Sequence, residues 1–387
     1  MTYMTEEEKK DLISFAQDII KIKSYSGKEK EVAERIKLEM QKLGYDEILE
    51  DGSGSVIGVL GNGPYHLLFD SHMDTVAVTE EAKWDYPPFG AQIDDGKLYG
   101  RGASDMKSSL VASVYAGAMM KKNGALEGKT VYVCGSALEE DYDGEGTYQA
   151  ITENHLRLDA VVICEPTHLK ISMGQRGRSV FRIHTEGISA HGAAPEKGVN
   201  AVYKMAEIID RIHKLSDELM SREGKHGSIV LSKIESTAVS INAVPDSCTI
   251  YLDRRTTVEE DEAYLTEEMN RLVAGTGATW DVYDVKGESY KGNPVLLHSL
   301  LPAWEIEESH PLAKGAMACF QDLFREAPEL YYWDFSTNGV ATAGKLHIPT
   351  IGFGAGIEKM AHQTNEYCPV DDLVKACEYF SRLPLFL

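Results

Sequence analysis

The chain has 387 residues, more than one ordinary hydrophobic core accommodates, so two domains are expected. Its hydrophobic content of 43% and charged content of 26% are those of a soluble globular protein, and no apolar run is long enough to span a membrane. The net charge of -22 at pH 7 argues against nucleic acid or an anionic membrane as a partner.

The composition also bears on the cellular compartment. Residues 1–8 are acidic, whereas a secretory signal peptide would begin with basic residues. The six cysteines are scattered and no two form a C-x-x-C pair, which is typical of reduced thiols that act as small hydrophobic side chains. We therefore expect a cytoplasmic protein.

The first predicted element is a helix that begins at a capping box formed by Thr5 and Glu8. A second helix over residues 29–42 and a strand–turn–strand over residues 46–59 follow. Three short apolar runs come next, at residues 67–70, 131–134 and 160–164. Short apolar runs bounded by turn residues predict strands buried on both faces of a parallel sheet.

Side chains that can bind metal follow each of these three strands. His72 and Asp74 follow the first strand, Glu139 and Glu140 the second, and Glu165 the third. Because ligands of such sheets bind in the crevice at the carboxyl ends of the strands, we expect these side chains to lie close together.

A glycine-rich loop between the first two strands carries Asp105 where the chain enters a helix. Five converging carboxylates repel each other by roughly 4 kcal/mol per pair at about 4 Å and an effective dielectric near 20. With a histidine present, the pattern predicts divalent metal, with two ions sharing a bridging carboxylate. Asp105 or Glu165 alone is more simply a solvated loop carboxylate, and Glu139 with Glu140 could be an ordinary charge pair at the start of a helix. The prediction therefore depends on the occurrence of these residues at successive strand ends.

The pattern changes after the third strand to the order β-α-β-β-α-β, which predicts a ferredoxin-like unit. Its strands are expected at residues 180–186, 229–234, 248–252 and 279–285, and its helices at 199–219 and 259–274. The C-terminal part returns to α/β character, with a helix at 311–324, a strand at 348–353 and a helix at 370–383. His362 follows that last strand and could reach the same crevice.

The predicted fold class is therefore α/β. We expect a central, mostly parallel sheet in a catalytic domain of residues 1–172 and 287–387. An inserted ferredoxin-like α+β domain of residues 173–286 would act as a lid. The sequence contains no H-E-x-x-H, G-x-S-x-G, P-loop or G-x-G-x-x-G motif, which argues against zincin, serine-hydrolase and nucleotide-binding functions.

Six segments of the chain resemble motifs of the M20 metallopeptidases, which include aminoacylases, carboxypeptidase G2, acetylornithine deacetylases and succinyl-diaminopimelate desuccinylases. The matching segments are residues 71–74, 100–107, 139–140, 165–166, 189–201 and 361–366. They span nearly the whole chain in the family's order. Within the family, residues 335–339 are most similar to the YgeY-like hydrolases linked to selenium metabolism.

The resemblance implies a metal centre with two ions. Asp105 would bridge them, His72 and Glu165 would complete one site, and Glu140 and His362 the other. Zinc is the expected metal, with cobalt or manganese as alternatives.

The resemblance also implies roles for residues that do not bind metal. Glu139 would be the general base, and Asp74 would orient the first histidine ligand. Asn242 and Arg255 would contact the substrate carboxylate and carbonyl. His191 would stabilise the oxyanion from the partner subunit of a homodimer that pairs through the lid.

The implied function is hydrolysis of an amide bond in a small N-acyl amino acid or a short peptide with a free carboxylate. Alternatives are a dipeptidase, a desuccinylase-like deacylase, a catalytically silent ligand-binding member and a structural metal site. Arg255 could instead form a salt bridge near the helix at residues 259–274. Asn338 stands where many members carry aspartate, a departure that leaves the substrate open rather than the reaction.

Overall fold

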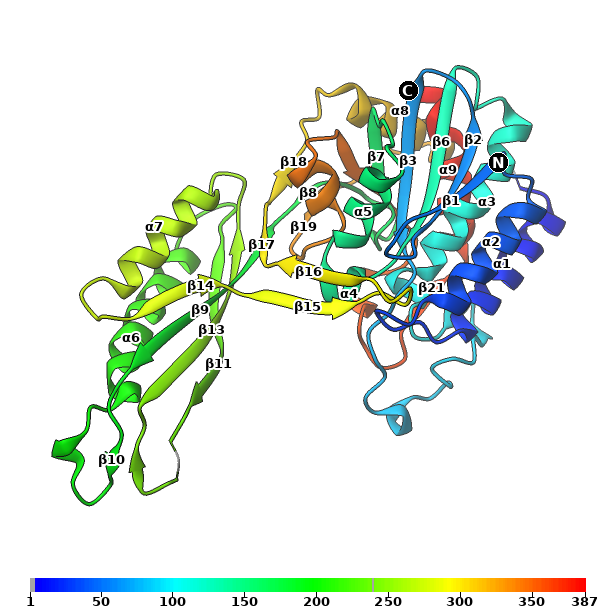
Figure 1. Ribbon diagram of the computed structural model, residues 1–387. Coiled ribbons are helices and arrows are strands. Elements are labelled where there is room, and N and C mark those ends of the chain that lie inside the picture. Colours follow the sequence, from blue (N-terminus) through cyan, green and yellow to red (C-terminus); the bar gives the residue numbers. More distant parts are fainter. Residues whose placement is uncertain (1–3, 239) are drawn as a thin grey trace.

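The computed structural model describes residues 4–238 and 240–387, and these form two domains (Figure 1). The large domain contains a nine-stranded sheet in the order β1-β2-β6-β3-β7-β20-β8-β18, with β19 beside β8. The four strands β6, β3, β7 and β20 at its centre run parallel. The bounds are β1 Glu47–Glu50, β2 Val56–Gly61, β3 Tyr65–His72, β6 Lys129–Ser136, β7 Ala160–Ile163, β8 Ile171–Gln175, β18 Trp304–Glu305, β19 Leu330–Trp333 and β20 Thr350–Gly352.

Helices cover the large sheet. One face carries α3, whose neighbours are α1 and α9, while α5 lies on the other face (Figure 1). The predicted capping box begins α1, because Thr5 Oγ1 accepts from Glu8 N and the Glu8 carboxylate accepts from Thr5 N. The helix bounds are α1 Glu6–Lys21, α2 Lys30–Lys42, α3 Ser108–Asn123, α4 Glu139–Tyr142, α5 Glu145–Glu153, α8 Pro311–Phe324 and α9 Val370–Arg382.

The second domain, here called the lid, has a five-stranded antiparallel sheet with two helices packed on one face (Figure 1). Its sheet order is β11-β13-β9-β14, with β17 also paired to β9. The bounds are β9 Gly177–Glu186, α6 Ala201–Met220, β11 Ser228–Ser236, β13 Ser247–Thr256, α7 Glu262–Val273, β14 Thr279–Val282 and β17 Leu300–Leu301. The predicted α/β fold with an inserted ferredoxin-like unit is thereby confirmed.

The chain crosses between the domains differently from the simple insertion expected. The expected boundary at residue 173 falls inside β8 of the large sheet, and the boundary at 286 falls inside β15. The single strand expected at residues 279–285 is interrupted, and β15 (Asp284–Glu288) forms a hairpin with β16 (Pro294–His298). The turn of this hairpin docks on the large domain, where Tyr290 Oη donates to Gly54 O and Asn293 Nδ2 to Gly52 O, both over 2.8 Å.

A small three-stranded sheet of β4 (Ile93–Asp94), β5 (Lys97–Tyr99) and β21 (Tyr367–Pro369) joins segments that are distant in sequence. It brings the glycine-rich loop at residues 100–107 next to the segment that carries His362. Among the helices of the described residues, none combines the length and the apolar character needed to cross a membrane.

Candidate active site

Three of the predicted site residues lie at the carboxyl ends of adjacent parallel strands. His72 ends β3, Glu139 begins α4 just after β6, and Glu165 follows β7. In register, β3 pairs in parallel with both β6 and β7, so these ends meet at one edge of the sheet. All three residues are buried, and one ligand atom from each lies within 4.8 Å of the others.

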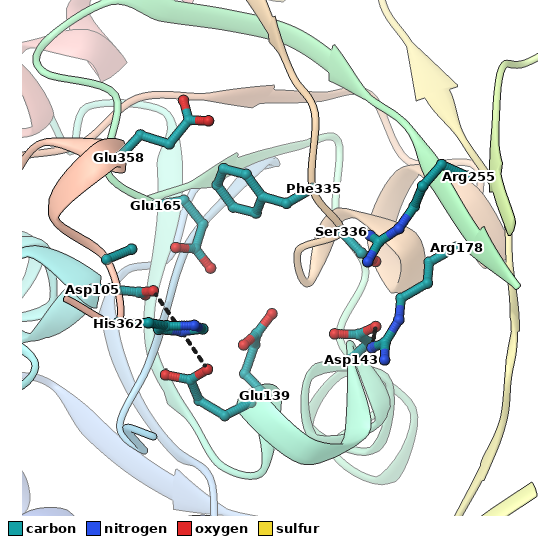
Figure 2. Close-up of a pocket in the computed structure, with 12 residues that line it drawn as sticks. Asp105, Glu139, Asp143, Glu165, Arg178, Arg255, Phe335, Ser336, Glu358 and His362 are labelled. Atoms are coloured by element: carbon teal, nitrogen blue, oxygen red, sulfur yellow. Dashed lines mark hydrogen bonds and ion pairs between the residues drawn. The ribbon is translucent and has the colours of Figure 1, made fainter. Parts of the chain in front are cut away.

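Asp105 lies between two imidazole rings, and its two carboxylate oxygens face different histidines. Oδ1 is 3.0 Å from His72 Nε2, and Oδ2 is 3.3 Å from His362 Nε2. His362 Nε2 is also 3.0 Å from Glu140 Oε2 (Figure 2), and His72 Nε2 is 3.6 Å from Glu165 Oε1. Asp105 therefore lies beside both histidines, and His72, Asp105 and Glu140 each offer a ligand atom within 4.8 Å of the others.

Asp74 supports this cluster from behind through both its backbone and its side chain. Its carbonyl oxygen is 2.9 Å from His72 Nδ1, and its carboxylate accepts from the backbone N–H groups of Glu139 and Glu140 over 3.1 and 3.0 Å. A His72 ring that donates from Nδ1 leaves the Nε2 lone pair free to bind a metal. Asp74 thus orients His72 mainly by its carbonyl, and it fixes the start of α4.

Burial makes the acids of the cluster difficult to ionise. Burial raises the pKa of Glu139 and of Glu165 well above the usual value. Burial and the nearby Asp105 raise the pKa of Glu140 to about 7. The repulsion expected from the sequence is therefore present at this site.

The histidines carry the compensating positive charge. Hydrogen bonds to Asp105 and Glu140 raise the pKa of His362 to about 10. Burial opposes protonation of His72, but the carboxylates of Glu165 and Asp105 still raise its pKa well above the usual value. Divalent cations would displace these protons and balance the carboxylates, because metal ligands bind deprotonated. Imidazole and carboxylate donors in this number suit zinc, cobalt or manganese.

A buried ion pair outside the cluster joins the two loops that supply Asp105 and His362. Glu366 Oε1 accepts from the backbone N–H groups of Ser104 and Asp105 over 2.9 and 3.0 Å. Its Oε2 accepts from Arg101 Nη1 over 2.5 Å, and Arg101 Nη2 donates to His362 O over 3.3 Å. This arrangement, here called the loop clamp, fixes the two residues relative to each other.

The cluster forms one wall of a cavity of about 450 Å³ between the large domain and the lid. Figure 2 shows the acids and His362 on one side of it and two arginines of the lid on the other. The remaining lining residues are Asp143, Phe335, Ser336, Glu358 and Ala361.

The two arginines reach the cavity from adjacent strands. Arg178 on β9 and Arg255 on β13 are directly opposite in the antiparallel register. Arg178 donates to Asp143 of the large domain over 2.9 Å, and Arg255 donates to Asp253 over 2.8 and 3.2 Å. Two positive side chains directly opposite each other destabilise a sheet unless anions balance them. Such a locally unfavourable arrangement is typical of binding sites.

A salt bridge near the helix at residues 259–274 was the alternative role for Arg255, and the residue that forms it is Arg254. Arg254 is fully buried and pairs with Glu260 and Glu268 near α7, each over 2.8 Å. Since successive residues of a strand point to opposite faces, Arg254 faces the helices and Arg255 faces the cavity.

Two of the predicted residues lie elsewhere. His191 is exposed in β10 (Ala190–His191), which pairs with β12 (Ala243–Val244), and Asn242 is exposed just before β12. Figure 1 shows β10 at the end of the lid farthest from the large domain. Within one chain, neither residue reaches the cavity.

Sequence analysis did not identify Arg178, Asp143, Glu358 or the loop clamp. Arg178 near the start of β9 and Asp143 at the end of α4 are 35 positions apart, and they meet only in the folded chain. The alternation of polar and apolar residues along β9 could have placed Arg178 on an accessible face, but it could not name the partner.

Three comparisons with known proteins agree with this geometry. Residues 68–385 match the model of peptidase family M20/M25/M40. Over 379 residues the chain is 37% identical to the uncharacterized protein YgeY of Escherichia coli (strain K12), covering 97% of this chain and 94% of that one. It is 25% identical over 409 residues to a probable succinyl-diaminopimelate desuccinylase of Staphylococcus epidermidis, covering 96% and 95% of the two chains.

A solved structure shares the whole fold. An M20 family metallo-carboxypeptidase from Sulfolobus solfataricus superposes with a TM-score of 0.76 at 20% sequence identity, covering 99% of each chain. The family resemblance expected from the sequence motifs is thereby confirmed.

Proposed function

This chain belongs to peptidase family M20/M25/M40 and is a hydrolase of amide bonds, and we propose that it works with two divalent metal ions, zinc in the first place. Its substrate would be a small N-acyl amino acid or a short peptide with a free carboxylate. The observation that carries this proposal is the position of Asp105, whose two oxygens lie 3.0 and 3.3 Å from the Nε2 atoms of His72 and His362. That geometry supports a bridging role.

The proposed ligand sets are His72 with Glu165 and His362 with Glu140, joined by Asp105. Divalent ions held there would lower the pKa of a water molecule and polarise the scissile carbonyl. The chain's own residues would supply the proton transfers and the orientation.

Glu139 is the proposed general base. It would take a proton from the attacking water and deliver it to the leaving amine. Burial raises the pKa of its carboxyl, and this shift supports the role, because a general base must first take up a proton and then release it. Its Oε2 is 4.0 Å from His72 Nε2, so the carboxylate lies next to the proposed metal ligands.

Arg255 and Arg178 are the proposed partners of the substrate carboxylate. A guanidinium group can bind a carboxylate through two parallel hydrogen bonds, which fixes the direction of the substrate as well as its position. Because both arginines belong to the lid, substrate binding would also hold the lid against the large domain.

The test is Glu139→Gln, with Asp141→Asn as the matched control on the same helix. Metal content and fold should be unchanged in both variants. Turnover of N-acyl amino acids and dipeptides should fall by about 10²- to 10⁴-fold in Glu139→Gln alone. Full turnover with intact metal content would show that another group is the base.

The same assay separates the rival functions. A panel of N-acetyl, N-succinyl and dipeptide substrates, with added zinc, cobalt or manganese, distinguishes a deacylase or desuccinylase from a dipeptidase. A catalytically silent protein would retain metal and hydrolyse none of them. The complete donor set and the adjacent Glu139 favour an active enzyme.

Two broader expectations remain proposals. We propose a cytoplasmic enzyme, which the six unpaired, buried cysteines support. We also propose a homodimer that pairs through the lid and in which His191 serves the partner's site. His191 is exposed at the end of the lid and lies outside the cavity of its own chain, which supports that role.

A further inference from the structure

Glu358 is an acid in the cavity that the proposed mechanism does not use. It lies in a short 3-10 helix, η5 (Glu358–Met360), and lines the cavity on the side away from Arg178 and Arg255 (Figure 2). Its carboxylate has no hydrogen bond or ion pair with another side chain in the part of the chain that the structure describes.

The position of Glu358 is unfavourable without a cation. Burial and repulsion from Asp334 raise the pKa of its half-buried carboxyl. Lys170 and Lys359 oppose this shift, but neither forms an ion pair with Glu358, because Lys170 pairs with Glu329 over 2.5 Å and Lys359 is exposed. A charged group that has no structural partner and faces a ligand cavity is a candidate for substrate recognition.

The charged side chains of the cavity lie on two opposite sides of it. Two arginines line one side, and the proposed metal ligands line the opposite side with Glu358 at one end of their row (Figure 2). A substrate whose carboxylate binds the arginines and whose scissile carbonyl faces the metal ligands would extend its acyl group toward Glu358.

We infer that Glu358 binds a protonated primary amine on the acyl side of the scissile bond. This inference rests on the proposed function and narrows its substrate class. The preferred substrates would carry a carboxylate at one end and an amine at the other, as dipeptides do. N-acyl amino acids that lack the amine would react more slowly.

Matched substrate pairs test this inference in the metal-loaded enzyme at pH 7. On one amino acid, glycyl is compared with propionyl, β-alanyl with butyryl, and γ-aminobutyryl with pentanoyl. Each pair differs only by an amine in place of a methyl group. In every case water adds across the amide, the C–N bond breaks, and the same amino acid is released and measured.

The wild-type enzyme should prefer the amine member by about 10- to 100-fold in kcat/KM for at least one chain length, as expected for a hydrogen bond between charged groups. Glu358→Gln and Glu358→Ala should each bring the ratio of kcat/KM for the amine member to kcat/KM for the acyl member close to one. Glu326→Gln removes an exposed acid outside the cavity and should keep the preference.

A binding measurement gives a readout that does not depend on turnover. In the Glu139→Gln background, calorimetric titration should show tighter binding of the amine member, and adding Glu358→Gln should abolish the difference. The inference is overturned if the two members of each pair react and bind equally. It is also overturned if the preference persists in Glu358→Gln, since the amine would then bind elsewhere, for example to the metal.

Failure of the proposed function would look different. If the metal-loaded wild type hydrolyses neither member of any pair nor any other amide of the panel, the amide hydrolase proposal fails. The binding ratio in the Glu139→Gln background still decides whether Glu358 selects an amine.

Discussion

At the level of single residues, Asn338 is a hydrogen-bond partner of a buried acid, Asp70, on the strand that ends at the proposed ligand His72. Its Nδ2 donates to Asp70 Oδ2 over 2.8 Å and to Ser136 Oγ over 2.9 Å, and Asp70 also accepts from Thr147. Asp70 and Asn338 are both buried, and burial raises the pKa of Asp70. An amide is therefore the suitable partner here, which gives a physical reason for the departure from the aspartate common in the family.

Asn338→Asp should destabilise the protein, because it removes two donated hydrogen bonds and places a second carboxyl beside Asp70. The expected loss in the free energy of unfolding is about 1–3 kcal/mol, measured by denaturant titration. The double variant with Asp70→Asn should recover most of the loss, since one donor amide is restored. If Asn338→Asp alone is as stable as the wild type, then water reaches the surroundings of Asp70 or the side chains there rearrange.

At the level of secondary-structure elements, the length of the strands decided which parts of the site could be predicted from the sequence. His72, Glu139 and Glu165 were predictable because buried apolar runs mark β3, β6 and β7, and parallel strands end at one edge. The loop clamp was not predictable, because Arg101 and Glu366 are 265 positions apart and meet only through the short strands β5 and β21. Strands of two or three residues carry too little periodicity to be recognised.

The loop clamp makes the two proposed metal positions unequal. His72 and Glu165 are buried at strand ends. The side chain of His362 is 52% exposed, and its loop is tied to the other ligand loop through Arg101 and Glu366. The position that includes His362 should therefore depend more on the clamp than the other one does.

Glu366→Gln should weaken metal binding at the His362 position, because the amide cannot balance Arg101 and holds the N–H of Asp105 less strongly. Loss of an outer partner of this kind costs about 10- to 100-fold in metal affinity. Calorimetric titration with zinc should show one tight site retained and one weakened. Gln363→Ala, on the exposed part of the same loop, is the control, and equal weakening of both sites in Glu366→Gln would argue against the asymmetry.

At the scale of the whole molecule, one chain leaves His191 far from its own cavity. Among the described residues, the lid sheet also ends at β11 in an edge without a partner strand, and Val230 and Ile234 are exposed on it. An open edge with exposed apolar residues can be covered by a second copy in a symmetric dimer. Such a dimer would carry the end of one lid toward the other chain.

Complementation tests whether His191 acts in the partner's site. Chains with Glu139→Gln and chains with His191→Ala should each be nearly inactive, since removing one oxyanion donor costs roughly 3–4 kcal/mol. After subunit exchange, a mixed dimer has one site with both residues intact, so activity should return toward a quarter of the wild-type value in an equal mixture. A strictly monomeric protein with full activity would rule out the role in trans.

The β15–β16 hairpin has a mechanical consequence for the lid. At one end it continues into lid strands β14 and β17, and at the other its turn is hydrogen-bonded to Gly52 and Gly54 of the large domain. A two-stranded ribbon resists stretching far more than torsion, so it limits how the lid can separate from the large domain. We therefore expect the lid to rotate about the long axis of the ribbon more easily than it moves away from the large domain. The cavity would then open by rotation of the lid about this axis and not by separation of the two domains. Arg178 and Arg255 would move along an arc past the proposed metal ligands.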